Sequence, residues 1–260
     1  YGDILGSGGG RRTNLFFLHQ IAALIVGITV IIDACEFLLI AAGMLADHLV
    51  EVIVLPAILL TCGRTNLLEK IAMNLYGKTT VMNEGVEIDF KAPYKKIGIL
   101  DAIKEYTGID VKGMDVEQLR ETCKKLNVEI EPSMGVGKLI DAIFGEYCEK
   151  HFIQPTFVTD YPVEMSPLTK RHRNDPTLTE RFELFVCGHE LANAYSELND
   201  PIDQRERFEE QARLKSNGDD EAMFIDYDFL RALEYGMPPT SGLGMGIDRL
   251  TMLMTGNNTI

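Results

Sequence analysis

The sequence predicts an α+β fold in which an antiparallel sheet is flanked by helices. The first observation is a β-hairpin pattern, because apolar and polar side chains alternate on both sides of a turn at residues 187–189. The second is a glycine-rich strand, in which every other residue of Gly242–Gly246 is a glycine on one face of an extended segment. The third is helical periodicity in the segments around these strands.

The charge of the chain is unevenly distributed. The 260 residues include 39 acidic and 25 basic side chains, which gives a net charge of −14. This balance argues against a free-standing nucleic-acid binder, because phosphate contacts need a basic surface, but it allows an enzyme that contacts nucleic acid through a local patch. The five cysteines are scattered and form no CxxC pair, so neither a disulfide framework nor a zinc site is predicted.

Residues 1–66 form an atypical apolar segment with only three basic and five acidic side chains. An uncharged run covers Thr13–Ile32 and reaches the length of about 20 residues that a membrane helix needs. We interpret the segment as a buried part of a soluble, cytoplasmic protein. A membrane or targeting segment and a grafted or rearranged segment stay open as alternatives.

The stretch from residue 67 to residue 152 predicts mainly helices. Apolar residues recur at a spacing of three or four in Leu67–Tyr76, Ile99–Thr107, Val116–Leu126 and Leu139–Phe152. Val86–Phe90 alternates like a short strand. The GVGK sequence before Leu139 lacks the spacing of a phosphate loop, so it predicts a glycine-rich turn. We expect residues from about 100 to 150 to form a helical insertion.

A strand at Pro155–Val158 precedes a long polar loop, Thr159–Thr179. The prolines of this loop and its basic residues predict a mobile surface segment. We group Arg181, two residues after the loop, with these basic residues. Loops of this length are uncommon unless they are functional.

The predicted hairpin, within Arg181–Asp200, brings polar side chains toward one surface. Its site residues are Glu183 on the first strand and Glu190, Asn193, Tyr195 and Glu197 on or before the second. Glu190 and Asn193 face opposite ways unless a bulge lies between them. Ionised carboxylates resist burial and repel one another, so they need Mg²⁺, an ammonium group or solvent. A polar face that is simply wet is the open alternative.

The C-terminal part predicts two helices, a glycine-rich strand and a further helix. The helices are Asp203–Asn217, with Asp200-Pro201 at its start, and Tyr227–Tyr235. A flat ligand can lie against the backbone of the glycine strand, because no side chains stand in the way. Arg249 follows at the start of a helix, where it can stack on a ring or meet a phosphate.

Three stretches carry a family resemblance. They are YPVEMSPL, FELFVCGHELANAYSELNDPIDQRERFEEQ and GDDEAMFIDYDFLRALEYGMPPTSGLGMGIDRL. Together they closely resemble class II lysyl-tRNA synthetases, and the Gly-x-Gly-x-Gly-x-x-Arg element ending at Arg249 matches the third signature motif of that class. The likeness runs from about Leu67 to residue 260. It implies a class II aminoacyl-tRNA synthetase-like fold, and it makes 67–260 the catalytic core.

The resemblance also implies a function and a set of roles. It implies ATP-dependent activation of lysine to lysyl-adenylate and transfer to tRNA(Lys), with Mg²⁺ as cofactor. Glu183 and Glu190 would hold Mg²⁺ against the phosphates of ATP. Asn193 would orient the substrate, Tyr195 would line the lysine pocket, and Glu197 would pair with the lysine ammonium group.

The nucleotide side of the site would come from the third motif. By resemblance, Gly244 and Gly246 form the floor on which ATP lies, and Arg249 is the catalytic arginine that stacks on adenine. The family also implies a homodimer. We find neither the first nor the second signature motif in residues 1–66, and no segment matches the anticodon-binding barrel. A truncated or engineered non-catalytic synthetase fragment and a paralogue that modifies a protein are therefore the alternatives.

Overall fold

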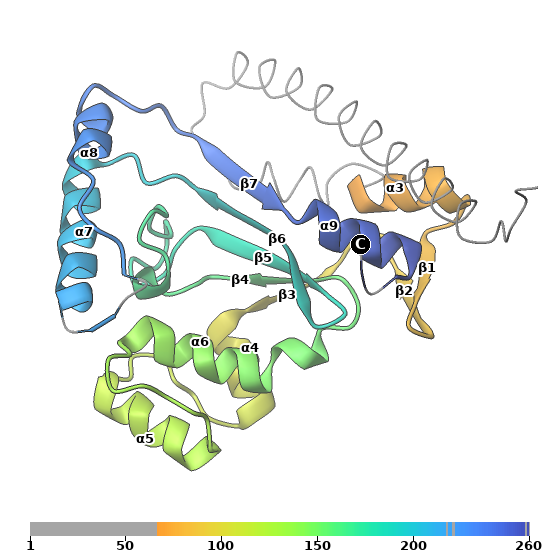
Figure 1. Ribbon diagram of the computed structural model, residues 1–260, viewed down its shortest axis with the longest axis horizontal. Helices are drawn as coiled ribbons and strands as arrows, with labels where there is room; N and C mark the ends of the chain where they lie inside the picture. Colours follow the sequence, from red (N-terminus) through yellow and green to blue (C-terminus); the bar gives the residue numbers. More distant parts are fainter. Residues whose placement is uncertain (1–66, 217, 220–221, 258, 260) are drawn as a thin grey trace, which may run out of the picture. The chain divides into compact units, whose positions relative to one another are not determined.

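The computed structural model describes residues 67–216, 218–219, 222–257 and 259 (Figure 1). The interpretation of residues 1–66 as a buried soluble segment therefore lies outside the described residues. The described chain divides into two compact units. The smaller unit contains residues 67–92 and the described residues after 246, and the larger unit contains residues 93–246.

The smaller unit consists of two helices and a hairpin. Its elements are α3 (Leu67–Tyr76), β1 (Thr80–Asn83), β2 (Val86–Asp89) and α9 (Ile247–Thr255). The hydroxyl of Tyr76 donates to the carbonyl of Met254 at 2.5 Å and so ties α3 to α9. The predicted helix and the predicted strand are confirmed. Sequence reasoning missed β1, whose four residues are too short for a clear alternation.

The larger unit is built around a five-stranded sheet with the order β3-β4-β5-β6-β7. The strands are β3 (Lys95–Gly98), β4 (Thr156–Thr159), β5 (Arg181–Val186), β6 (His189–Ser196) and β7 (Ser241–Met245). All neighbours are antiparallel except β3 and β4. The antiparallel sheet with the hairpin and the glycine strand side by side is therefore confirmed (Figure 1).

The β5–β6 hairpin closes through Cys187 and Gly188, which both have positive φ angles, as a tight two-residue turn requires. Its register contains a bulge, without which Glu190 and Asn193 would face opposite ways. Phe185 is opposite Glu190, whereas Leu184 is opposite Ala192, so one residue of β6 is unpaired. The bulge places Glu190 on the same face as the later odd-numbered residues of β6.

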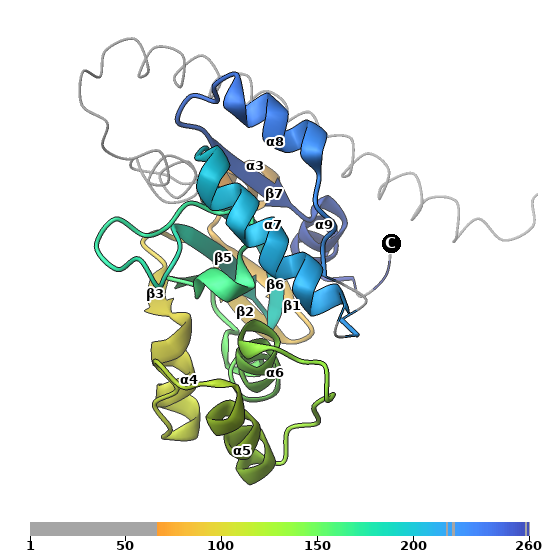
Figure 2. The same ribbon diagram turned by 90° about the vertical axis from the view of Figure 1, so that its left-hand side faces the viewer.

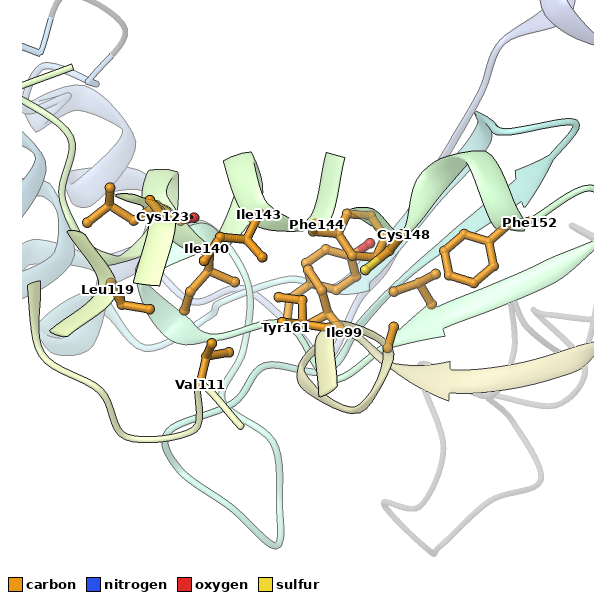
Figure 3. Close-up of a cluster of buried hydrophobic side chains, with 14 of the residues drawn as sticks. Ile99, Val111, Leu119, Cys123, Ile140, Ile143, Phe144, Cys148, Phe152 and Tyr161 are labelled. Atoms are coloured by element: carbon orange, nitrogen blue, oxygen red, sulfur yellow. Dashed lines mark hydrogen bonds between the residues drawn. The ribbon is translucent and has the colours of Figure 1, made fainter. Parts of the chain in front are cut away.

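Three helices precede β4 and share a hydrophobic core. They are α4 (Ile99–Thr107), α5 (Val116–Leu126) and α6 (Val136–Tyr147), followed by a short 3-10 helix, η1 (Glu149–His151). The first two match the predicted bounds, while α6 begins three residues earlier than predicted and ends at Tyr147. Figure 3 shows Ile99, Ile143 and Phe144 packed around Tyr161, which joins the helices to the sheet. That this segment is an insertion stays a prediction.

The loop between β4 and β5 is partly buried and partly exposed. It contains the 3-10 helix η2 (Val163–Met165), and Tyr161, Ser166, Thr169 and Thr179 are buried. The predicted surface position is confirmed for the basic stretch, because Lys170, Arg171 and Arg173 are exposed. The ends of the loop are tied together, since the N–H and the hydroxyl of Thr179 both donate to the carbonyl of Tyr161 at 2.8 Å.

Two helices lie between β6 and β7 in the chain. These are α7 (Pro201–Ser216) and α8 (Tyr227–Glu234), which lie side by side (Figures 1 and 2). The rings of Phe208 on α7 and Phe229 on α8 are 6.0 Å apart. The end of α7 reaches the start of α6, because a Cβ added to Gly135 would lie 3.4 Å from Leu214 Cδ2 and Lys138 on α6 pairs with Asp219 at 2.7 Å.

Candidate active site

One face of the β5–β6 hairpin carries the residues that the sequence singled out. Asn193 is directly opposite Glu183, and Tyr195 is opposite Arg181. Glu190 lies diagonally from Glu183 across the bulge, and its charge reaches the hydroxyl of Tyr161, as does that of Glu183. The structure thus brings the predicted carboxylates and the amide to one surface.

Glu183 is buried, with 8% of its surface exposed, and both of its carboxylate oxygens have partners. Oε1 accepts from the guanidinium of Arg181, and Oε2 accepts from the hydroxyl of Tyr161 at 2.8 Å. Sequence reasoning missed this role of Arg181. A signal was available, because Arg181 and Glu183 have the same parity on a strand and therefore face the same way.

Tyr161 contacts both Glu183 and Arg181. Its ring is buried in the helical core, and the guanidinium carbon of Arg181 lies 4.5 Å from the centroid of the ring. Burial and then the negative charge of Glu183 raise the pKa of Tyr161 well above its usual range. The phenol therefore stays protonated and acts as a donor to Glu183.

Glu197 differs from Glu183 in having no cationic partner among the described residues. Its side chain is partly buried, and burial raises the pKa of its carboxyl group. Within the described residues its carboxylate accepts no hydrogen bond and forms no ion pair. A cation supplied by a ligand would satisfy this group.

The glycine strand β7 makes room for the Glu197 carboxylate. A Cβ atom added to Gly242 would lie 2.6 Å from Glu197 Oε1, so a side chain cannot occupy that position while the carboxylate does. Gly242 is opposite Tyr195, and Gly244 is opposite Asn193. Burial and the nearby charge of Glu197 raise the pKa of Tyr195, which keeps its hydroxyl protonated.

The remaining nucleotide-site residues lie at the end of the glycine strand and beyond it. Gly246 follows β7, and its N–H donates at 2.9 Å to the carbonyl of Leu191, the bulge residue. Arg249 is exposed in the first turn of α9, as the sequence predicted. Because α9 belongs to the smaller unit, the stacking of Arg249 on a nucleotide base stays a prediction.

A Mg²⁺ site at Glu183 and Glu190 stays a prediction. Within the described ranges, no group of three or more His, Cys, Asp and Glu side chains could hold a metal ion. Mg²⁺ often takes only one or two carboxylates and completes its shell with water and phosphate. Each oxygen of Glu183 keeps a second lone pair beside its present hydrogen bond, so its partners leave room for an ion.

A second arginine joins the loop before β5 to α7. Arg207 on α7 is buried and donates to the carbonyls of Ser166 and Thr169 at 2.9 and 2.8 Å. Asp203 pairs with Arg207 at 3.0 Å and also with Arg171, and the hydrogen bonds from these arginines hold the pKa of Asp203 low although burial raises it. The sequence predicted this helix but gave no sign of the buried arginine on it.

These features agree with a known family. Residues 62–260 match the family described as tRNA synthetases class II (D, K and N). This match covers more than half of the chain, so the chain belongs to the class II tRNA synthetases of the D, K and N type. The predicted class II fold is thereby confirmed.

Three individual relatives that match this chain are ligases for lysine. The lysine–tRNA ligase of Porphyromonas gingivalis is 66% identical over 194 residues, which cover 75% of this chain and 34% of the relative. That of Christiangramia forsetii is 62% identical with the same coverage, and that of Azobacteroides pseudotrichonymphae is 59% identical over 75% of this chain and 39% of the relative. The chain thus spans about a third of the length of these curated relatives.

Among the described residues, no helix is long and apolar enough to cross a membrane.

Proposed function

We propose that the chain is the lysine-activating part of a lysine–tRNA ligase. The observation that carries the proposal is the Glu197 carboxylate, which is partly buried, has a raised pKa and has no partner among the described residues. The ε-ammonium group of lysine supplies the cation that this carboxylate lacks. The similarity to three bacterial lysine–tRNA ligases supports the choice of lysine.

The proposed reaction has two steps. First, an oxygen of the lysine carboxylate attacks the α-phosphorus of ATP, the bond from that phosphorus to the bridging oxygen breaks, and pyrophosphate leaves. Second, a terminal hydroxyl of tRNA attacks the carbonyl carbon of lysyl-adenylate, and AMP leaves. Neither step needs a covalent intermediate with the protein, so the protein acts by positioning and by stabilising charge.

Each described residue has a place in this scheme. Glu197 binds the ammonium end of lysine, and Tyr195 lines the pocket between that end and the reacting carboxylate. Asn193 orients the reacting end. Gly244 and Gly246 provide an open floor for the nucleotide, and Arg249 stacks on adenine and offsets phosphate charge. Mg²⁺, held by Glu183 and Glu190, neutralises charge on the phosphates when it is bound.

The lysine site also explains discrimination. An amino acid of similar size without a terminal charge would leave Glu197 desolvated and unpaired, which is costly. A site built around a charged group of the substrate therefore rejects analogues that lack it far better than an apolar pocket would. Norleucine, which is lysine without the ε-amino group, is the sharpest such analogue.

Lysine-dependent exchange of pyrophosphate into ATP tests the activation step. The full chain should exchange pyrophosphate in the presence of lysine and Mg²⁺, and Glu197→Gln should abolish the exchange while the protein stays folded. Folded protein that binds lysine without exchange would indicate a non-catalytic fragment. Transfer of labelled lysine to tRNA(Lys) rather than to a protein acceptor would then separate the ligase from a protein-modifying paralogue.

The proposal extends to the partners and the location that the family resemblance implies. These are ATP and tRNA(Lys) as substrates, a homodimer, and a cytoplasmic protein. Light scattering on the purified chain measures its mass in solution and decides between one and two copies. Binding of tRNA(Lys), measured at several salt concentrations, tests whether a chain of net charge −14 has a local basic patch.

A further inference from the structure

The side chain of Arg181, on the site face of the hairpin, donates hydrogen bonds to four groups. Its guanidinium donates to Glu183, to Asn193 Oδ1 at 3.3 Å, and to the loop at Met165 O and Ser166 Oγ, both at 3.0 Å. An arginine has five N–H donors in a fixed planar fork, so these contacts fix its orientation. Its side chain is 17% exposed, and the ring of Tyr161 covers one face of it.

The hydrogen bond to Asn193 has a chemical consequence. A guanidinium can only donate, so it must meet the oxygen of the Asn193 amide and not its nitrogen. The amide nitrogen, Nδ2, then points away from Arg181. In the described part of the chain it has no acceptor, and it is not among the buried atoms without a partner, so solvent or a ligand can reach it.

A reachable amide N–H₂ group on this face suits one end of the proposed substrate. An amino acid carries its only anionic acceptor, the α-carboxylate, at the end opposite to the side-chain ammonium. Asn193 and Glu197 have the same parity on β6 and its continuation and are four residues apart. A donor at Asn193 and an anion at Glu197 therefore match the two ends of lysine in sign.

We propose that Arg181 is a positioning residue that holds the Asn193 amide with its N–H₂ group toward the carboxylate of the bound amino acid. This inference rests on the proposed function, because it takes the substrate to be lysine. Without Arg181, the amide can rotate and present its oxygen, which would repel the carboxylate. The same arginine fixes Glu183, so the loss of its charge would also loosen the neighbouring carboxylate.

The experiment compares two ligands by calorimetry on the full chain. Lysine has both ends, whereas cadaverine, its decarboxylated analogue, keeps the ammonium for Glu197 but lacks the carboxylate. In Arg181→Gln, the affinity for lysine should fall about tenfold or more, as expected for a hydrogen bond to a charged group. The affinity for cadaverine should change less than about twofold, because no contact to it depends on Asn193.

Three further variants keep the result interpretable. Asn193→Asp retains an acceptor for Arg181 but has no N–H₂ group, so it should fold and lose affinity for lysine alone. Arg181→Lys keeps the charge without the fork and should be intermediate. Arg173→Gln, which removes an arginine that donates to buried Glu180 at 2.7 Å, controls for the loss of a nearby arginine and should keep the preference for lysine. Thermal unfolding of each variant identifies any that fails to fold.

The outcomes separate this inference from the proposed function. Loss of the lysine preference in Arg181→Gln, with no additional loss when it is combined with Asn193→Asp, supports the role of Arg181. An equal fall for both ligands, or none for either, would show that Arg181 is only a structural residue. If Arg181→Gln does not fold, an unchanged lysine preference in Asn193→Asp overturns the inference. A wild-type chain that binds neither ligand overturns the proposed function, and this inference with it.

Discussion

The Glu197 carboxylate occupies the space where a side chain on Gly242 would stand. A Cβ at position 242 would be 2.6 Å from Glu197 Oε1, which is closer than real Cβ contacts come. Glu197 directly follows β6 and Gly242 lies in β7, and the N–H of Glu197 donates to the carbonyl of Thr240, just before β7, at 3.0 Å. The glycine therefore fixes where the proposed lysine-binding carboxylate can sit.

Gly242→Ala should weaken lysine binding, because the methyl group must displace the Glu197 carboxylate. We expect a loss of about tenfold or more in affinity, since a misplaced charged partner costs about 1.5 kcal/mol or more. Calorimetry with lysine in the absence of ATP measures it. Gly244→Ala is the matched control on the same strand, because its Cβ would meet only Asn193 O, at 3.9 Å. Equal affinities in the two variants would contradict the argument.

Glu197→Gln should raise the stability of the fold at pH 7 but weaken the binding of lysine. The pKa of Glu197 is raised in the folded chain, so ionisation at neutral pH opposes folding. The variant should therefore unfold at a slightly higher temperature than the wild type at pH 7, and this difference should vanish as the pH falls below the pKa of an unfolded glutamate. Its affinity for lysine should fall at least about thirtyfold.

The same pKa predicts how lysine binding depends on pH. An ammonium group favours the ionised carboxylate, so the affinity of the wild type for lysine should fall as the pH is lowered through the raised pKa of Glu197. In that range, binding should release a proton, which calorimetry in two buffers of different ionisation enthalpy detects. Glu197→Gln should lose both effects. A pH-independent affinity in the wild type would count against Glu197 as the ammonium partner.

Tyr161→Phe should destabilise the fold without changing its core packing. The variant removes the 2.8 Å hydrogen bond to Glu183 Oε2 and leaves a buried carboxylate oxygen without that partner. We expect a loss of about 1–3 kcal/mol in the free energy of unfolding, as measured by urea denaturation. Tyr227→Phe, whose ring is 65% exposed on α8, should change stability by less than about 0.5 kcal/mol. Similar losses in both variants would contradict the bond's importance.

Gly137 and Gly145 of α6 provide a test, with its own control, of how closely α6 packs against the loop between β4 and β5. A Cβ on Gly137 would be 2.8 Å from the carbonyl oxygen of Glu164, whereas one on Gly145 would meet nothing closer than 4.0 Å. Gly137→Ala should cost about 1–3 kcal/mol through overpacking. Gly145→Ala should be neutral or stabilising by up to about 1 kcal/mol, because alanine favours a helix. Stabilisation by both changes would show that α6 does not press on the loop.

The sequence predicted the parts of the fold that have a clear period. The alternation in residues 181–200, the glycines of β7 and the apolar spacing of α4 and α5 each define a local structure, and all are confirmed. The bulge could be inferred as well, because Glu190 and Asn193 could share a face in no other way. Class II membership followed from motifs in these same segments.

The contacts between elements could not be predicted in this way. Arg181 and Tyr161 are 20 residues apart, and only the folded loop brings the guanidinium over the ring. The sequence predicts that Mg²⁺, an ammonium group or solvent satisfies the carboxylates. An arginine of the chain itself is not among these predicted partners. In the structure, Glu183 accepts a hydrogen bond from Arg181, whereas Glu197 has no arginine partner among the described residues. That difference supports the separate roles that we propose for two glutamates that look alike in the sequence.

The measurement that tests the central claim most directly is the affinity of the wild-type chain for lysine and for norleucine. Both ligands have the same α-amino and carboxylate groups and differ at the side-chain end, where norleucine lacks the ammonium. If Glu197 is the ammonium partner, lysine should bind and norleucine should bind at least about a hundredfold more weakly. Equal binding of the two ligands would contradict the account, because the Glu197 carboxylate would then have no part in choosing the substrate.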